Sequence, residues 1–163
     1  MRLKTVINLS FICFTVLCST ATSVAAATAT ATVAVTAAVL SVCTIAATPL
    51  AFGVYSSAAV AATSTLTVVC TLTTPYTIAL DAGTGTGANT TTRKMSNGGN
   101  TLSYQLFRDA ARTQNFGSTA GTDTASGTGT GVAQSVTIYG QIVASQNVAA
   151  GAYTDTVTAT LTY

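Results

Sequence analysis

The sequence contains no histidine, no tryptophan and no glutamate, because all four of its acidic residues are aspartates. General acid–base catalysis near neutral pH usually relies on histidine or on a glutamate with a raised pKa, and a serine nucleophile needs such a base beside it. The aspartates lie in four separate segments, so the pattern does not indicate a paired-carboxylate site. The sequence therefore predicts a protein that is not an enzyme and that uses no cofactor and no metal.

Charge is also scarce, since only 6% of the residues are charged, compared with about 25% in an average domain. The net charge of +2 comes from Arg2 and Lys4, and the other charged residues balance at four against four. No basic surface is expected to bind nucleic acid, and no small-molecule substrate is indicated. Low charge removes a common protection of strand edges against pairing with other chains, which favours a protein that assembles.

The first residues have the pattern of a secretory signal peptide. Arg2 and Lys4 precede the largely apolar segment 6–18, and small residues follow at 23–25. We expect residues 1–25 to be this peptide, with cleavage between residues 25 and 27, and no other segment approaches the roughly 18 apolar residues of a membrane span. The sequence thus predicts an exported protein.

Two of the four cysteines, Cys13 and Cys18, would leave with the signal peptide. Cys43 and Cys70 remain, and an even pair in an exported protein predicts a disulfide. Closing a loop of this size is expected to stabilise the fold by about 3–4 kcal/mol. Two thiols without a histidine would not fill a tetrahedral metal site.

Short alternating segments rich in threonine and valine predict an all-β protein, an antiparallel sandwich of immunoglobulin-like type with about seven strands. The clearest candidate strands are 63–72, 76–83, 101–107, 134–143 and 155–163. In the last of these, one face carries Val157, Ala159, Leu161 and Tyr163. Gly140 indicates a bulge or a close backbone approach.

The segments between these candidate strands have loop-like compositions. Residues 83–100 are expected to form a long loop or a poorly packed hairpin, and residues 117–131 a flexible connection. The two GTGTG runs, at 83–87 and 127–131, lack the lysine and the helix start of a phosphate loop, so we interpret them as turns. Arg108, Asp109 and Arg112 are interpreted as a solvated turn with one local ion pair, with a ligand patch as the alternative.

Residues 27–40, ATATATVAVTAAVL, alternate apolar and hydroxyl side chains over about twice the usual length of a strand. No hairpin turn precedes this segment to supply a partner within the chain. The pattern predicts a strand with one buried face, but it does not identify the sheet that the strand joins.

Several motifs resemble the spore coat protein U-like domain family, which includes subunits of the archaic Csu-type chaperone–usher pili. They include LAFGVY (50–55), VVCTL (68–72), LSYQLFRDAART (102–113), VTIYGQI (136–142) and GAYTDTVTATLTY (151–163), in this order over most of the chain. The resemblance implies an incomplete immunoglobulin-like sandwich that lacks its last strand. It also implies a periplasmic chaperone that lends a strand, an outer-membrane usher, and neighbouring subunits joined head to tail by strand addition.

In this interpretation residues 26–37 form an N-terminal donor strand and residues 38–163 form the spore coat U-like domain. The donor would insert Ala31, Val33, Val35, Ala37 and Val39 into a neighbouring subunit, and strand 155–163 would be the edge of the acceptor groove that the chaperone also uses. Leu40 and Val42 occupy the other face of the alternation, so the donor could instead end at residue 36, with 37–44 belonging to the domain's own sheet. The sequence predicts an extracellular pilus subunit for adhesion or biofilm formation; the alternatives are a surface- or glycan-binding tip protein and a spore-coat-like structural protein.

Overall fold

The structure is a computed structural model that describes residues 24–163, so nearly all of the predicted signal peptide lies outside the described residues. The chain divides into two units, residues 1–37 and residues 38–163, which are considered separately. Residues 24–42 form no strand and are exposed throughout. Between residues 24 and 163, no helix has the length and apolar character needed to cross a membrane.

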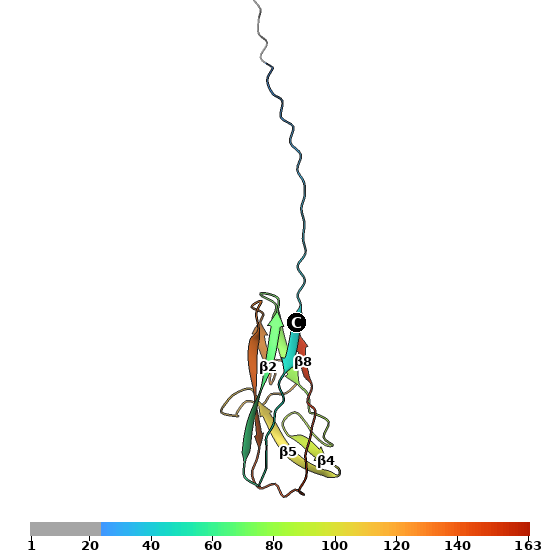
Figure 1. The fold of residues 1–163 in the computed structure, drawn as a ribbon, viewed down its shortest axis with the longest axis vertical. Helices are drawn as coiled ribbons and strands as arrows, with labels where there is room; N and C mark the ends of the chain where they lie inside the picture. Colours follow the sequence, from blue (N-terminus) through green and yellow to red (C-terminus); the bar gives the residue numbers. More distant parts are fainter. Residues whose placement is uncertain (1–23) are drawn as a thin grey trace, which may run out of the picture. The chain divides into compact units, whose positions relative to one another are not determined.

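Residues 38–163 form two antiparallel β-sheets that face each other (Figure 1). The strands are β1 Cys43–Ala47, β2 Val60–Cys70, β3 Pro75–Leu80, β4 Arg93–Asn97, β5 Asn100–Phe107, β6 Ala125–Thr128, β7 Gln134–Ile142 and β8 Ala159–Thr162. One sheet has the order β1-β2-β7-β5-β4 and the other the order β6-β3-β8. The predicted all-β antiparallel fold is therefore confirmed.

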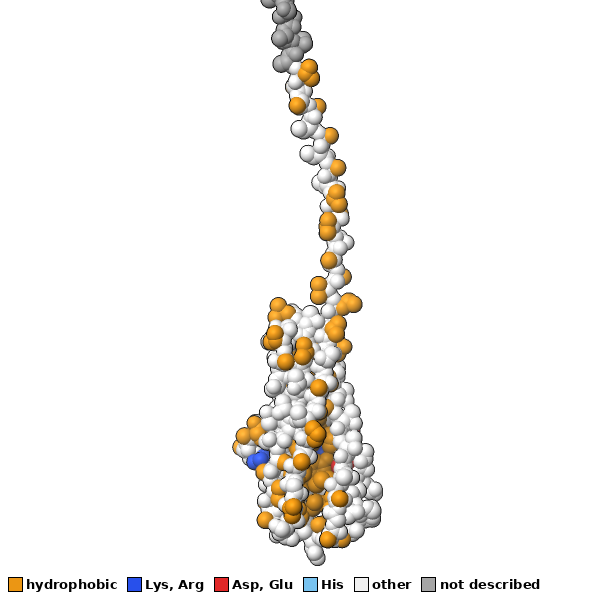
Figure 2. Space-filling view, viewed as in Figure 1, with side chains coloured by type: hydrophobic (Ala, Val, Ile, Leu, Met, Phe, Trp, Pro, Cys, Tyr) orange, Lys and Arg blue, Asp and Glu red, His pale blue; other side chains and the backbone are white. Residues whose placement is uncertain are grey.

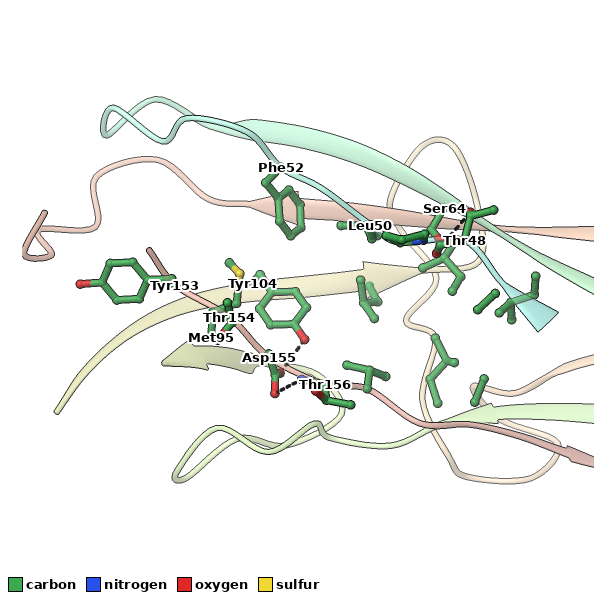
Figure 3. A pocket seen from close by; sticks show the side chains of 18 residues that line it. Thr48, Leu50, Phe52, Ser64, Met95, Tyr104, Tyr153, Thr154, Asp155 and Thr156 are labelled. Atoms are coloured by element: carbon green, nitrogen blue, oxygen red, sulfur yellow. Dashed lines mark hydrogen bonds between the residues drawn. The ribbon is translucent and has the colours of Figure 1, made fainter. Parts of the chain in front are cut away.

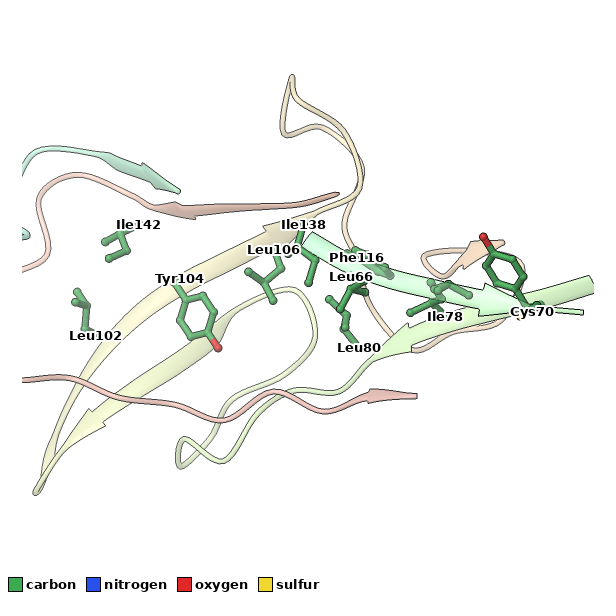
Figure 4. Packing of buried hydrophobic residues seen from close by; sticks show 12 residues of the cluster. Leu66, Cys70, Ile78, Leu80, Leu102, Tyr104, Leu106, Phe116, Ile138 and Ile142 are labelled. Carbon is green, nitrogen blue, oxygen red and sulfur yellow. The ribbon is translucent and has the colours of Figure 1, made fainter. Parts of the chain in front are cut away.

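The alternation of side chains explains why these segments form a sandwich. In β2, Leu66, Val68 and Cys70 are buried, while the residues between them face away from the core. Successive side chains of a strand point to opposite faces, so each alternating segment supplies one row to the core. The rows from the two sheets meet in one cluster, formed by Leu66, Val68, Cys70, Tyr76, Ile78, Leu80, Leu102, Tyr104, Leu106, Phe116, Ile138 and Ile142 (Figure 4).

Both segments that the sequence indicated as loops contain a strand. Within 83–100, β4 pairs with β5 through a two-residue turn at Gly98 and Gly99, and Gly98 has a φ of 57°. A positive φ at this position is readily adopted by glycine, which makes the pair a suitable hairpin turn. Within 117–131, β6 forms the edge of the smaller sheet. The hairpin alternative for 83–100 therefore holds for the end of that segment. The flexible connection predicted for 117–131 was wrong, and so was the turn interpretation of Gly127 and Thr128 in the second GTGTG run, because β6 is short and mostly polar and apolar alternation does not reveal it.

The last strand is shorter than the predicted 155–163. β8 begins at Ala159, because the residues before it make other contacts: Thr154 forms a β-bridge with Ser96 of β4. The segment thus crosses from the edge of the larger sheet to the smaller sheet, where Leu161 pairs with Ile78. Tyr163 is 57% exposed, so the expected inward row ends at Leu161.

Gly140 allows the connection between β1 and β2 to pack closely on β7. It lies opposite Ala62 in a regular ladder, so the bulge alternative is wrong. A β-carbon at this position would lie 2.9 Å from the ring of Phe52 and 3.0 Å from Leu50. The close-approach alternative is confirmed, and the connection after β1 lies directly against the larger sheet.

Candidate functional site

A groove lies between the connection that follows β1 and the segment that leads into β8 (Figure 3). It encloses a cavity of about 410 Å³. Apolar core residues from both sheets form its floor, namely Leu66, Leu80, Leu106 and Ile138. Its walls are formed by 47–50 and Phe52 on one side and by 153–157 and Ala159 on the other, with Met95 and Tyr104 at one end.

The strands that continue the two walls of the groove, β1 through Ala47 and β8 through Ala159, are both edge strands of their sheets. Within residues 24–163, β1 is the first strand of the five-stranded sheet and pairs only with β2, whereas β8 is the last strand of the three-stranded sheet and pairs only with β3. An edge strand presents a row of unpaired backbone N–H and C=O groups. The groove thus combines an apolar floor with two backbone edges, which is the arrangement that can accept an added strand.

Asp155 fixes the β8 side of the groove. The Tyr104 hydroxyl donates a hydrogen bond to Oδ2 of Asp155 at 2.7 Å (Figure 3). The backbone N–H of Thr84 and its hydroxyl both donate to Oδ1, at 2.7 and 2.8 Å. Burial, together with the hydrogen bond to Asp155, raises the pKa of Tyr104 above its ordinary value, so the phenol stays protonated and remains a donor.

Gly83 explains why the first GTGTG run lies beside Asp155. Gly83 has a φ of 77°, and a β-carbon there would collide with the Asp155 carboxylate. The glycine therefore permits the 83–87 turn to approach the segment that forms the wall of the groove, and Thr84 follows with its two donors. A turn is what the sequence predicted for this run, although its contact with Asp155 was not visible in the sequence.

Arg93 is a buried cation that the sequence did not reveal as a site residue. Its side chain has 0% exposure and donates to four backbone carbonyl oxygens, those of Leu80, Asp81, Thr90 and Phe116, at 2.8–3.2 Å. Burial lowers the pKa of Arg93 from its ordinary value, although nearby Tyr104 and Asp81 oppose this effect. The guanidinium joins β4, the end of β3 and the Phe116 segment beneath the groove.

Asp81 holds the residues just before β8. Its Oδ1 accepts the backbone N–H groups of Thr158 and Gly83, both at 2.9 Å. Burial alone would raise the pKa of Asp81, but these hydrogen bonds and the Arg93 charge hold it below its ordinary value of 3.8. The ionised carboxylate therefore stabilises the connection between the end of β3 and the wall of the groove.

This lowered pKa predicts a loss of stability in acid. A carboxyl group with a pKa that is lower in the folded than in the unfolded state contributes its full stability above the unfolded value, and this contribution disappears as the pH falls through the folded value. We expect Asp81→Asn, which keeps the Oδ1 acceptor, to lose less stability than the wild type between about pH 5 and about pH 2. Urea unfolding at several pH values measures this slope, and identical slopes would contradict the role of Asp81.

The structure places the predicted site residues as follows. Val157 and Ala159 line the groove, Leu161 packs against the core, and Tyr163 is exposed. The predicted donor residues Ala31, Val33, Val35, Ala37 and Val39 are exposed in the single chain, as are Leu40 and Val42. The predicted disulfide joins Cys43 and Cys70, which lie opposite each other in β1 and β2.

The turn at 108–115 is held by hydrogen bonds to the backbone instead of the predicted local ion pair. The Arg108 guanidinium donates to the carbonyl oxygens of Asn115, Thr122 and Thr124. Asp109 accepts the backbone N–H groups of Thr113 and Gln114, and the bond from Gln114 is the main cause of its lowered pKa. Within the described range 24–163, no cluster of three metal-binding side chains occurs.

These features define an open antiparallel sandwich with an apolar groove between two edge strands. Residues 29–160 match the Spore Coat Protein U domain, and the chain belongs to this family. The resemblance found in the sequence motifs is therefore confirmed.

Among solved structures, the chain is similar to one in "Crystal structure of CsuC-CsuE chaperone-tip adhesion subunit pre-assembly complex from archaic chaperone-usher Csu pili of Acinetobacter baumannii". The two share 24% sequence identity, with a TM-score of 0.55. The similarity covers 77% of this chain but only 40% of the other, so the chain spans less than half the length of that relative. It supports the immunoglobulin-like fold. The comparison with curated proteins found no match.

Proposed function

We propose that the protein is a structural subunit of a chaperone–usher pilus and that its subunits join by donor-strand exchange. One observation carries the proposal: the sandwich is open between two edge strands above an apolar floor, and the same chain carries an unpaired alternating segment. The segment complements the groove, because it offers a row of small apolar side chains to the apolar floor and a backbone that can pair along an edge strand. The role is structural and does not involve catalysis.

The donor is the segment 26–37, extended by Val39, and its inserted row is Ala31, Val33, Val35, Ala37 and Val39. These side chains are exposed in the single chain, so their transfer into a groove removes apolar surface from water. Each buried valine is worth at least about 1.5 kcal/mol and each alanine methyl about 0.8 kcal/mol. Backbone hydrogen bonds to β8 add about 0.5–1.5 kcal/mol each.

The acceptor is the groove beside β8, with Val157, Ala159 and Leu161 as its apolar edge. An isolated subunit would expose this edge, so a periplasmic chaperone is expected to cover it before the neighbouring donor does. A donor at one place and an acceptor at another make a head-to-tail contact, which generates an open fibre. The relative from Csu pili and the family membership support export through the periplasm, passage through an outer-membrane usher and a place in a cell-surface pilus used for adhesion or biofilm formation.

Substitution on the two faces of the donor tests this proposal. Val33→Asp and Val35→Asp place a charge on the inserted row, and we expect either variant to abolish fibres, because burying an unpaired carboxylate is strongly unfavourable. The matched control is Thr32→Asp, which places the same charge on the opposite face and should still allow assembly. Electron microscopy and the ladder of oligomers that persists in cold SDS measure the outcome, with chaperone and usher co-expressed.

The folded domain itself provides a second readout. A variant lacking residues 26–36 should remain monomeric, and a synthetic peptide of residues 26–39 should raise its unfolding temperature. The same peptide with Val33→Asp should raise it much less. Normal fibres from the deletion variant would exclude the donor assignment.

A further inference from the structure

The two ends of the domain carry different exposed apolar groups. At the end where β1 begins lie four exposed side chains, Val42, Leu72, Val132 and Tyr163, with exposures of 57–64%. We call this set the apolar pole. Val42 and Thr71 are joined by a backbone hydrogen bond, as are Gly131 and Cys70. Tyr163 follows Thr162, which pairs with Thr77 near the start of β3, so all four residues belong to one end.

The opposite end is built from three turns, 53–59, 97–100 and 143–152, which we call the loop end. The turns are joined to one another, since Ser145 donates to the Ser57 carbonyl and Gly151 lies against Asn97. Val54 is 89% exposed here and Val143 is 44% exposed. Both ends therefore present apolar side chains to solvent.

Neither end carries a charged side chain. None of the eight charged residues of the described chain belongs to the pole or to the three turns; they are Asp81, Arg93, Lys94, Arg108, Asp109, Arg112, Asp123 and Asp155. Figure 2 agrees for the face it shows, on which hydrophobic side chains are widespread and charged ones are few. Contact through Leu72 and Val132 would bury apolar surface without desolvating a charged side chain.

The direction of β8 determines at which end of the acceptor subunit the carboxyl end of an inserted donor strand leaves the groove. β8 runs toward the pole, because its last residue, Thr162, pairs with Thr77 while Ala159 pairs with Leu80. A donor that pairs antiparallel with β8, the more stable arrangement, runs from the pole of the acceptor toward its loop end. The carboxyl end of the donor, Ala37, would then leave the groove at the loop end of the acceptor.

Only five residues, 38–42, separate Ala37 from Cys43, the first residue of β1. Five extended residues span at most about 18 Å. The pole of the copy that gives the donor must therefore lie close to the loop end of the copy that receives it. If Val39 is also inserted, the connection is shorter still.

We propose that the apolar pole of one subunit packs directly against the loop end of the next, with Leu72 and Val132 facing the turns that carry Val54 and Val143. The partner that covers the apolar pole is thus a second copy of this chain. This inference rests on the proposed donor-strand assembly and adds a second, direct contact between neighbouring domains. Because that contact is apolar and uncharged, we expect it to persist at high salt.

Photo-crosslinking in assembled fibres tests this contact. Leu72→p-benzoylphenylalanine and, separately, Val132→p-benzoylphenylalanine should give covalent dimers and longer oligomers that survive boiling in SDS. Peptide mapping should place the adducts in 53–59 or 143–152 of the neighbour. The control is Ala110→p-benzoylphenylalanine, an exposed position in the 108–115 turn, which should give no such ladder.

The outcomes separate this inference from the proposed function. Fibres that assemble normally but give no adduct from either pole position would overturn the contact while leaving donor-strand exchange intact. Adducts mapped to the neighbour's own pole would also overturn it, because they require the opposite donor direction. Failure of the unmodified protein to form fibres would overturn both.

Discussion

Replacing Arg93 with methionine is expected to lower the free energy of unfolding by about 3–5 kcal/mol, a large part of the 5–15 kcal/mol that stabilises a typical domain. The methionine would keep much of the volume but none of the donors. Carbonyl oxygens of Leu80, Asp81, Thr90 and Phe116 would then lose this partner in a site that water does not reach. A buried acceptor without a partner costs about 1–3 kcal/mol, and these costs do not add fully.

Lys94→Met provides the matched control for this prediction. It removes one positive charge from the adjacent residue, whose side chain is only partly buried, and we expect it to change stability by less than about 1 kcal/mol. Arg93→Lys should fall between the two, because an ammonium retains the charge but cannot reach four separated acceptors. Urea unfolding followed by circular dichroism measures all three, and equal midpoints for Arg93→Met and Lys94→Met would contradict the role of the buried guanidinium.

Much of the sandwich could be predicted from the sequence because its core strands are long and alternate regularly. β2, β5 and β7 each place a row of apolar side chains inside, and that pattern is visible without any knowledge of the partner strands. β4 was left open between a loop and a hairpin, and β6 was missed, because each contributes only one hydrophobic side chain to the core, Met95 and Ala125. The most deeply buried residue of β4 is Arg93, and an arginine in a polar segment gives no signal of burial, since its burial depends on carbonyl groups from distant segments.

The groove could be predicted only in part. The alternation of Val157, Ala159 and Leu161 correctly marked the residues that face the interior, but it also suggested one continuous strand to Tyr163. The break arises from Thr154, which bridges to Ser96, and from the Asp155 side chain, which binds Tyr104 and Thr84. Such contacts join residues far apart in the chain, and no local pattern encodes them.

Removing the disulfide by the double substitution Cys43→Ala and Cys70→Ala is expected to cost about 3–4 kcal/mol. The bond closes a loop across a sequence separation of 27 residues and joins two directly opposed positions of β1 and β2. Without it, β1 is held to the domain by a five-residue ladder, by the hydrogen bonds between Val42 and Thr71, and by the Thr48 contacts with Ser64 and Thr65. Chemical denaturation of the variant and of the oxidised wild type measures the cost.

Removing the disulfide should also change the groove, because β1 leads directly into one of the groove walls. Ala47, the last residue of β1, and Leu50 line the cavity, while Cys70, the last residue of β2, is almost fully buried. If the disulfide fixes this wall, peptide 26–39 should bind the double variant more weakly than the oxidised protein under conditions in which both are folded. A stability loss with unchanged peptide affinity would show that the disulfide holds the domain together without shaping its acceptor groove, whereas thiol labelling of both cysteines in the oxidised, folded wild type would contradict the bond itself.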